Sequence, residues 1–351
     1  MSRTLRVLAL TPYPIEGPSS RYRVYQFVPG LSQEGIFLEI RPFMDSATYR
    51  KRMQSKRKLG PAILWGLAGG MVQRLASLLV INRYDAVLVH RQMAPVLHGP
   101  INKLLRWAKV PVVYDFDDAV FTSHTIMDIL RHSRVVFAGN EYLAEYARRH
   151  GHARVLVVPT VVDTEQFVPL CWKENPVPVV GWIGTEGSFR HYLKPPLSHL
   201  VAMVHSHGAV FRVIGPPTIR AEVEAEGAEF VPWALQTEVA ELGRLDIGVM
   251  PLVMDDYVLG KCAFKLVQYG AMGLPSVGSP IGANVEVIRH GETGFLADTL
   301  EAWEQALGQL LTDPGLRRQM GERARRHVVE RFSLATQISE VCDALRAVAG
   351  R

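Results

Sequence analysis

The chain has 351 residues, 48% of them hydrophobic, which is enough for two domains with cores of their own. Its 39 basic and 34 acidic side chains give a net charge of +5, which suits phosphorylated substrates or an anionic membrane but is too small and dispersed to indicate nucleic-acid binding. The cysteines Cys171, Cys262 and Cys342 lie far apart, which excludes a disulfide or zinc framework built on paired cysteines. The short apolar run at the N-terminus and the lack of an uninterrupted membrane-length stretch predict a cytoplasmic protein.

The chain opens with a predicted strand, loop and helix. Leu5–Leu10 is continuously apolar, as in a strand buried on both faces of a parallel sheet, and a helix is expected from about Ser20. This is a Rossmann-like opening without the glycine fingerprint of dinucleotide binding, which disfavours a nicotinamide-dependent dehydrogenase. Arg21 and Arg23 follow at the carboxyl edge of the strand, where they are either ligand contacts or solvated surface arginines.

A basic segment and then an apolar segment follow the second predicted strand, at 37–43. The six basic residues lie together without an acid: Arg50, Lys51, Arg52, Lys56, Arg57 and Lys58. One interpretation is a basic surface loop followed by an ordinary core helix from about Met71. The other is that residues 50–72 lie on an anionic membrane surface, with Trp65 at the headgroup boundary. Pro61 and the glycines are expected to prevent a regular spanning helix.

Polar residues end two further predicted strands. His90 and Arg91 end the strand at 84–91, and Asp115, Asp117 and Asp118 lie in the segment 110–121. Carboxylates this close repel one another, so we expect one or two of them to face a ligand. Alternatively, one of them caps the following helix. No His or Glu stands at the spacing that a metal site would need.

A linker rich in proline and charge, Cys171–Val179, separates the first half from a second Rossmann-like set of strands and helices. The prediction is therefore an α/β protein of two doubly wound domains, 1–170 and 171–332, with a final helix within 333–351.

The second half contains a predicted anion site within Lys261–Leu296. Lys261 and Lys265 are four residues apart, and Gln268 is three further on, which predicts that they share one face of a helix. Gly273 suits the C-cap of that helix, and a short buried strand and a second helix, from Asn284, are expected to follow. Such a basic face beside a glycine-rich loop can bind an anion, although an ordinary strand-helix unit would look similar.

The segment 264–296 resembles the donor-binding region of glycosyltransferase family 4, a group of GT-B enzymes. The pattern GKCxxKLxQY is similar to one of its sub-groups. Two departures stand out. Gln268 occupies the position of the glutamate that usually holds the donor ribose, and Gly260 occupies that of a second glutamate, which contacts the transferred sugar. The segment 182–191 resembles the family's donor-phosphate loop, with Thr185 where an arginine is usual.

This resemblance implies two Rossmann-like domains facing a cleft, an N-terminal one for the acceptor and a C-terminal one for a nucleotide sugar, with the last helix packing back on the first domain. It implies sugar transfer with retention to an acceptor hydroxyl, on a sugar or a lipid-linked glycan precursor, without a metal or other cofactor. The expected catalytic residues are Asp117, Asp118 and Lys261. The expected donor-binding residues are Gly184, Thr185, Arg190, Lys261, Lys265, Gln268, Gly282 and Asn284, and the expected acceptor-binding residues are Arg21 and Arg23. A nucleotide-sugar epimerase of the same architecture and a non-catalytic nucleotide-sugar-binding subunit are the alternatives.

Overall fold

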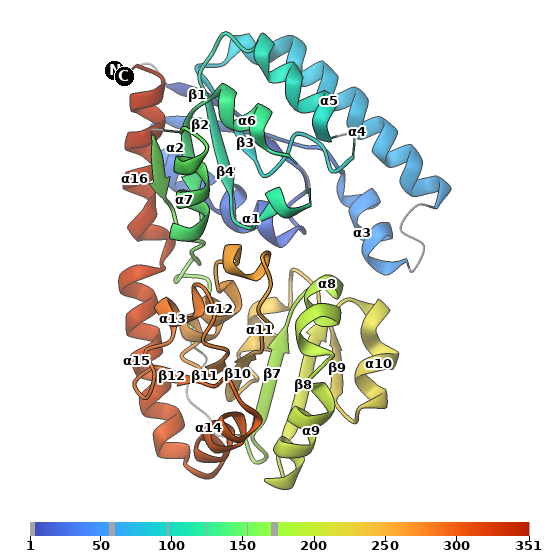
Figure 1. The fold of residues 1–351 in the computed structure, drawn as a ribbon, viewed down its shortest axis with the longest axis vertical. Helices are drawn as coiled ribbons and strands as arrows, with labels where there is room; N and C mark the ends of the chain where they lie inside the picture. Colours follow the sequence, from blue (N-terminus) through green and yellow to red (C-terminus); the bar gives the residue numbers. More distant parts are fainter. Residues whose placement is uncertain are drawn as a thin grey trace. The chain divides into compact units, whose positions relative to one another are not determined.

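The computed structural model describes residues 4–55, 60–96, 98–123, 125–152, 154–169 and 175–350. The chain forms two compact units, each built around its own parallel sheet with helices on its faces (Figure 1). Unit 1 comprises Met1–Val161, Leu259–Cys262 and Leu334–Arg351, and unit 2 comprises Val162–Val258 and Ala263–Ser333. The two six-stranded sheets confirm the predicted fold class of two doubly wound α/β domains.

The sheet of unit 1 has the strand order β2-β1-β3-β4-β5-β6, and all its neighbouring strands are parallel. The strands are β1 (Leu5–Thr11), β2 (Ile36–Pro42), β3 (Ala86–His90), β4 (Val112–Phe116), β5 (Ser133–Ala138) and β6 (Val155–Val157). The helices are α1 (Pro18–Arg23), α2 (Val28–Gln33), α3 (Ser46–Gln54), α4 (Pro61–Val80), α5 (His98–Asn102), α6 (Met127–His132), α7 (Glu141–Arg149) and α16 (Leu334–Val348). Because all strands run the same way, their carboxyl ends meet at one edge of the sheet.

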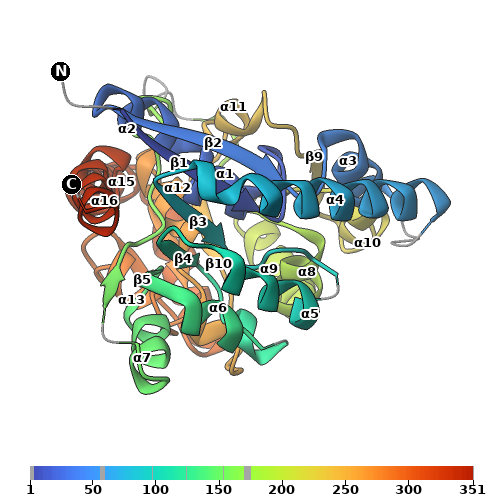
Figure 2. The same ribbon diagram turned by 90° about the horizontal axis from the view of Figure 1, so that it is seen from above.

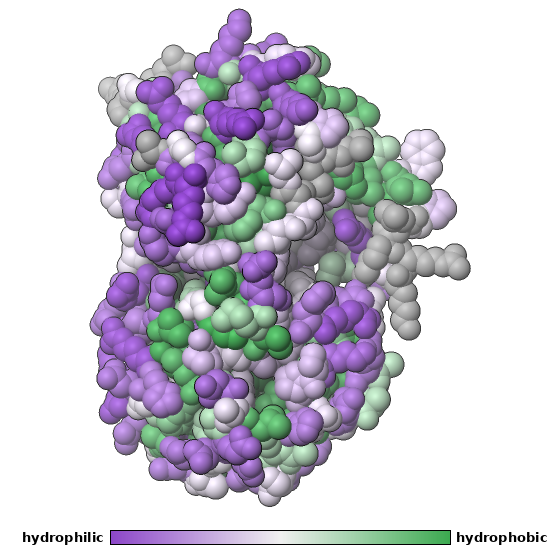
Figure 3. All heavy atoms as spheres, in the orientation of Figure 1, coloured by the Kyte–Doolittle hydropathy of each residue, from purple (hydrophilic) through white to green (hydrophobic). Residues whose placement is uncertain are grey.

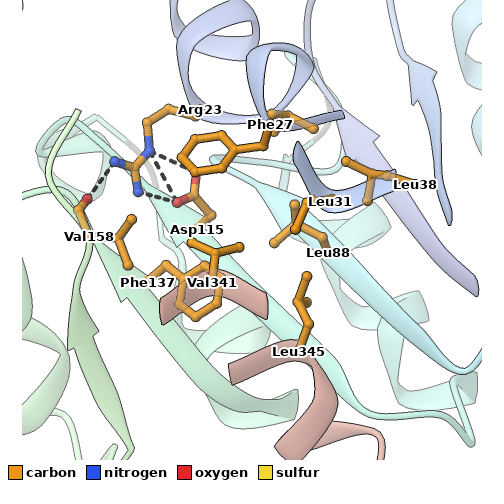
Figure 4. Close-up of a pocket in the computed structure, with 11 residues that line it drawn as sticks. Arg23, Phe27, Leu31, Leu38, Leu88, Asp115, Phe137, Val158, Val341 and Leu345 are labelled. Carbon is orange, nitrogen blue, oxygen red and sulfur yellow. Dashed lines mark hydrogen bonds and ion pairs between the residues drawn. The ribbon is translucent and has the colours of Figure 1, made fainter. Parts of the chain in front are cut away.

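The last helix completes the core of unit 1. Val341, Leu345 and Val348 of α16 pack with apolar side chains of β1, α2 and β5, and α16 runs beside α2 (Figure 2). A small cavity of about 20 Å³ remains in this core, with Arg23 and Asp115 at one end of its lining (Figure 4). The rest of the lining is apolar, so the two ionised side chains enter the core as a pair.

Helix α4 differs from its prediction. It begins at Pro61, not at about Met71, because proline is well tolerated in the first turn of a helix. The glycines do not break it. They let it approach its neighbours, since a Cβ on Gly70 would lie 2.2 Å from the Phe43 carbonyl oxygen, and one on Gly66 would lie 2.0 Å from the Thr48 hydroxyl. By length and composition the helical stretch Pro61–Arg83 could cross a membrane, and a third of its most apolar window is buried. The prediction that no apolar segment reaches that length is therefore wrong.

The sheet of unit 2 has the order β12-β11-β10-β7-β8-β9 and is also parallel. Its strands are β7 (Val179–Ile183), β8 (Val210–Gly215), β9 (Glu229–Pro232), β10 (Ile247–Met250), β11 (Ser276–Gly278) and β12 (Gly294–Leu296). Its helices are α8 (Glu186–Ser188), α9 (Leu197–Ser206), α10 (Arg220–Ala225), α11 (Glu238–Leu242), α12 (Phe264–Ala271), α13 (Asn284–Val287), α14 (Leu300–Thr312) and α15 (Pro314–Arg331).

Helix α12 is held tightly against this sheet. The Tyr269 hydroxyl accepts a hydrogen bond from the Ile183 backbone N–H at 3.1 Å, and its ring occupies the space where Gly248 of β10 has no side chain. Gly273 follows the helix with a φ of 69°, which confirms the predicted C-cap. The strand and helix expected after it are β11 and α13.

Candidate functional site

Three polar side chains of unit 1 form a chain at the carboxyl edge of its sheet. His90 ends β3 and is the register partner of Asp115 in β4. Its Nδ1 lies 2.6 Å from the Asp115 Oδ2, and its Nε2 lies 2.6 Å from the Oγ of Ser19 in the first turn of α1. His90 and Asp115 are almost fully buried, whereas Ser19 is half-buried. The sequence does not indicate Ser19 or its contact with His90, because the two partners of His90 are 71 and 25 residues away from it.

An ion pair with Arg23 keeps Asp115 charged inside the core. The Arg23 Nε lies 3.2 and 3.3 Å from the two carboxylate oxygens, and its Nη2 also pairs with the carboxylate (Figure 4). Burial alone would raise the pKa of Asp115, but the Arg23 charge and the His90 contact lower it below its ordinary value. Arg23 was predicted to contact an acceptor. Its guanidinium is instead directed into unit 1, where it also donates to the Val158 carbonyl.

Arg91 gathers the two candidate carboxylates that follow β4. Its Nη2 lies 2.6 Å from the Asp118 Oδ2, and its Nε lies 3.5 Å from the Asp117 Oδ1. Arg91 has a φ of 57°, which is uncommon for a residue with a side chain and costs on the order of 1–3 kcal/mol. The Tyr114 hydroxyl fixes this conformation by donating to the Arg91 carbonyl at 2.8 Å. Helix α6, which follows Phe121, has Ile126 as its N-cap and no side-chain cap, so the alternative that an aspartate caps this helix is wrong.

The segment Leu259–Cys262 lies in unit 1, beside the same loop. The Asn140 amide donates to the carbonyls of Leu259 and Lys261 at 3.2 and 3.1 Å, and the Cys262 thiol donates to the Asp117 carbonyl at 3.2 Å. Burial raises the pKa of this thiol well above its ordinary value, so it remains a protonated donor.

Gly260 has no room for a side chain. A Cβ at this position would lie 2.5 Å from the Ala119 backbone nitrogen, closer than real contacts allow. The departure from the family's glutamate therefore has a structural reason, because the segment approaches the Asp117–Ala119 loop too closely for any larger residue.

Lys261 and Lys265 do not share a helix face, which corrects the prediction. Helix α12 begins only at Phe264, after Ala263 has turned the chain with a φ of 50°. Lys261 thus precedes the helix and belongs to unit 1, whereas Lys265 is in the first turn and belongs to unit 2. Residues four apart share a face only within one continuous helix. The left-handed conformation of Ala263 lies between the two lysines, so they do not belong to the same helix.

In unit 2, Lys265 lies beside the loop that follows β7. Its Nζ is 5.2 Å from the centre of the Trp182 ring, and a side chain on Gly184 would meet both residues. Thr185 caps the next helix by accepting from the Ser188 N–H. A cation and a bare glycine backbone thus lie beside the first turn of α12, whose N-terminus has no side-chain cap, and such an arrangement can bind an anion.

Gln268 forms part of a buried cluster in which Glu238 is the acceptor. The Gln268 Nε2 and the Trp233 Nε1 each lie 3.2 Å from the same oxygen of Glu238, and Glu238 is only 6% exposed. Sequence analysis passed over Glu238, because a glutamate in a short helix rich in acids resembles a solvated residue.

The remaining predicted residues have varied surroundings. Asn284 is buried and donates to the Ser279 carbonyl at 2.9 Å, while Gly282 turns the loop before it with a φ of 54°. Arg190 pairs with Glu186 and Glu222 at the surface, so its charge is already balanced.

Arg21 of unit 1 is buried, with its guanidinium 4.4 Å from the centre of the Tyr22 ring. In the ranges that the structure describes, no three His, Cys, Asp or Glu side chains are grouped to hold a metal ion.

Comparisons with known proteins show a likeness over part of the sequence. Residues 178–313 match the model of the family described as glycosyl transferases group 1. The chain is 40% identical over 114 residues to an N-acetyl-alpha-D-glucosaminyl L-malate synthase of Bacillus anthracis, but this alignment covers only 30% of each chain.

Solved structures extend the likeness to nearly the whole chain. HepE of Anabaena with UDP and glucose has a TM-score of 0.67 at 13% identity, covering 98% of this chain and 100% of that one. Sucrose-phosphate synthase of Thermosynechococcus elongatus has a TM-score of 0.71 at 14% identity, covering 99% of both chains. The fold is GT-B. The family match is confined to residues 178–313, which is less than half of the chain.

The close approach at Gly260 can be tested by adding one methyl group. We expect Gly260→Ala to destabilise unit 1 by about 1–3 kcal/mol, because the new Cβ must displace the Ala119 backbone. Gly99→Ala is the matched control, since its Cβ would meet nothing within 4 Å. The measurement is urea unfolding followed by circular dichroism. Equal midpoints for the two variants would show that position 260 tolerates a side chain.

Proposed function

We propose that the protein is a retaining glycosyltransferase that moves a sugar from a nucleoside-diphosphate sugar to an acceptor hydroxyl. The observation that carries this proposal is Lys265 in the first turn of α12, beside Gly184 and within the region that matches the family. HepE of Anabaena has been solved with UDP and with UDP-glucose, which supports a uridine nucleotide as the first donor to test.

The positive groups around the N-terminus of α12 suit a departing diphosphate. Negative charge grows on the diphosphate as its bond to the anomeric carbon breaks, and preorganised positive groups stabilise that charge. Lys265 supplies a full charge, and the N-terminus of α12 supplies backbone N–H groups and a partial positive charge. In this proposal these groups replace a metal ion.

The acceptor belongs to the carboxyl edge of unit 1. The relative from Bacillus anthracis is named for an N-acetylglucosaminyl group and malate, so UDP-N-acetylglucosamine and a small hydroxy acid form a natural first pair. Asp117 is 9% exposed and lies next to Ser19, where it can accept a hydrogen bond from an incoming hydroxyl.

Incubation with a panel of uridine-diphosphate sugars tests the proposal directly. We expect the protein to release UDP and to form a glycoside when an acceptor is added, as followed by mass spectrometry. Conversion of the donor into an isomeric sugar nucleotide would instead identify an epimerase. A rise in melting temperature with a donor, without turnover of any acceptor, would indicate a non-catalytic binding subunit.

Lys265→Ala should weaken UDP binding at least about tenfold, because a charge-assisted hydrogen bond is worth about 1.5–3 kcal/mol. Lys194→Ala is the matched control, since Lys194 is an exposed lysine of unit 2 that pairs with Glu222. Isothermal calorimetry measures both affinities. An unchanged UDP affinity in Lys265→Ala would remove this residue from the donor site.

We also propose that α4 docks unit 1 on an anionic membrane surface. One face of the helix packs on unit 1 through Ile63, Leu67 and Arg74. The opposite face exposes a stripe of apolar side chains (Figure 3), made of Leu64, Trp65, Val72, Leu75 and Leu79. A helix held by one face lies along a surface better than it crosses one.

The charge of the neighbouring segment suits such a surface. Arg50, Lys51 and Arg52 lie in α3, and Arg50 is 61% exposed at its side chain while pairing with Glu16. Lys56, Arg57, Lys58 and Leu59, which belong to the predicted element 50–72, lie outside the described residues. A membrane position would bring a lipid-linked acceptor to unit 1, and would make the protein a peripheral one on the cytoplasmic face.

Replacing Trp65, Val72 and Leu79 by Gln should abolish co-sedimentation with anionic vesicles, because these side chains supply the apolar contact. Neutralising the six basic residues of 50–58 should remove the preference for anionic over neutral lipid. The control is Met254→Gln, which replaces an exposed apolar residue of unit 2. Binding of the wild-type protein that does not depend on anionic lipid would contradict the proposal.

A further inference from the structure

The chain of contacts from Ser19 through His90 to Asp115 has a geometry that packing alone does not require. Both imidazole nitrogens are engaged at 2.6 Å, one by a carboxylate and one by a hydroxyl, and His90 has no exposed surface. Of these three residues, only Ser19 is partly exposed. A buried imidazole between an acid and a partly exposed hydroxyl is the arrangement that moves protons in general base catalysis.

We propose that Ser19, His90 and Asp115 form a proton relay that takes the proton of the acceptor hydroxyl during sugar transfer. This inference rests on the proposed glycosyltransferase function and adds the residues that remove the proton. Ser19 would contact the acceptor, and His90 would act through Ser19.

The protonation states follow from the partners. Asp115 is ionised, because its contacts with Arg23 and His90 lower its pKa despite burial, and a carboxylate can only accept hydrogen bonds. The Nδ1 of His90 must therefore donate to it, which leaves Nε2 as an acceptor. The Ser19 hydroxyl then donates to Nε2, so its own lone pairs face an incoming donor.

In the retaining transfer the acceptor oxygen forms a bond to the anomeric carbon on the same face that the diphosphate leaves. The bond from that carbon to the diphosphate oxygen breaks, and the diphosphate keeps the electron pair. The acceptor proton passes to the Ser19 Oγ, and the original Ser19 proton passes to the His90 Nε2. Asp115 stabilises the resulting imidazolium, which afterwards returns its proton to water through Ser19.

The charged groups around the relay favour His90 over the neighbouring carboxylates as the proton acceptor. Asp117 and Asp118 both face Arg91, at 3.5 and 2.6 Å, so each already has a cation as its partner. Asp117 also lies 3.4 Å from the Ser19 Oγ, a long contact compared with the 2.6 Å to His90. Arg23 is paired with Asp115. The Cys262 thiol is protonated and donates to the Asp117 carbonyl.

An anionic acceptor that has no proton separates the relay from a structural role. Water and alcohols need a base when they attack the donor sugar, whereas azide does not. In Ser19→Ala and His90→Gln we expect transfer to water or alcohol to fall about 10²–10⁴-fold, while transfer to azide stays within about threefold of wild type. Glutamine suits position 90 because its amide can both donate and accept hydrogen bonds yet cannot carry a proton.

Two further variants separate a relay from a structural role and from a different base. His132→Gln replaces an exposed histidine of unit 1 and should leave both reactions unchanged. Equal losses with water and azide in the relay variants, or no loss with either, would overturn the relay. A selective loss of the water reaction in Asp117→Asn, and not in His90→Gln, would make Asp117 the base.

The tautomer of His90 supplies a test without turnover. In a spectrum of the protein labelled with ¹⁵N-histidine, the relay requires a protonated Nδ1 and a bare Nε2 whose shift changes in Ser19→Ala. The opposite tautomer overturns the relay whether or not sugar is transferred. If the wild-type protein turns over no nucleotide sugar, the proposed function fails. If it does, and the variants treat water and azide alike, only the relay fails.

Discussion

Unit 1 depends on one buried carboxylate that two partners hold in place. Asp115 accepts from Arg23 on one side and from His90 on the other, and its side chain is only 3% exposed. Burying one ion alone would cost several kcal/mol, and removing Arg23 would leave such an ion. Because the pKa of Asp115 is lowered in the folded state, its contribution to stability is present at neutral pH and is lost as the pH falls through that lowered value.

The same pair links the core to the edge of the sheet. Arg23 and Asp115 line the apolar cavity together with Val341 and Leu345 of α16 (Figure 4). Asp115 also contacts His90, and His90 contacts Ser19, so the ion pair joins the core to the edge of the sheet.

The sequence was sufficient to predict the two parallel sheets, and with them the edges at which their strands end. Continuous apolar runs such as Leu5–Leu10 and Val179–Ile183 form buried parallel strands, and Gly273 ends a helix where its φ of 69° requires glycine. These features are local, so they follow from a few neighbouring residues. The pairing of His90 with Ser19, 71 residues away, is not local, and no periodicity indicates it.

Two glycine positions depend on a close approach that the sequence does not indicate. The glycines of α4 are not helix breakers, since Gly70 lets the helix approach the Phe43 carbonyl. Gly260 likewise lets its segment approach Ala119. A glycine permits both flexibility and contact, and only the three-dimensional neighbours distinguish the two.

The cluster in unit 2 shows how a departure at one position can be balanced at another. With Gln268 in place of a glutamate, the carboxylate at this edge is that of Glu238, and the glutamine amide becomes one of its donors together with the Trp233 indole. Both donors are neutral N–H groups, and Glu238 is only 6% exposed. The Gln268 amide thus joins α12 to α11 through Glu238, where a glutamate at position 268 would place two acids side by side.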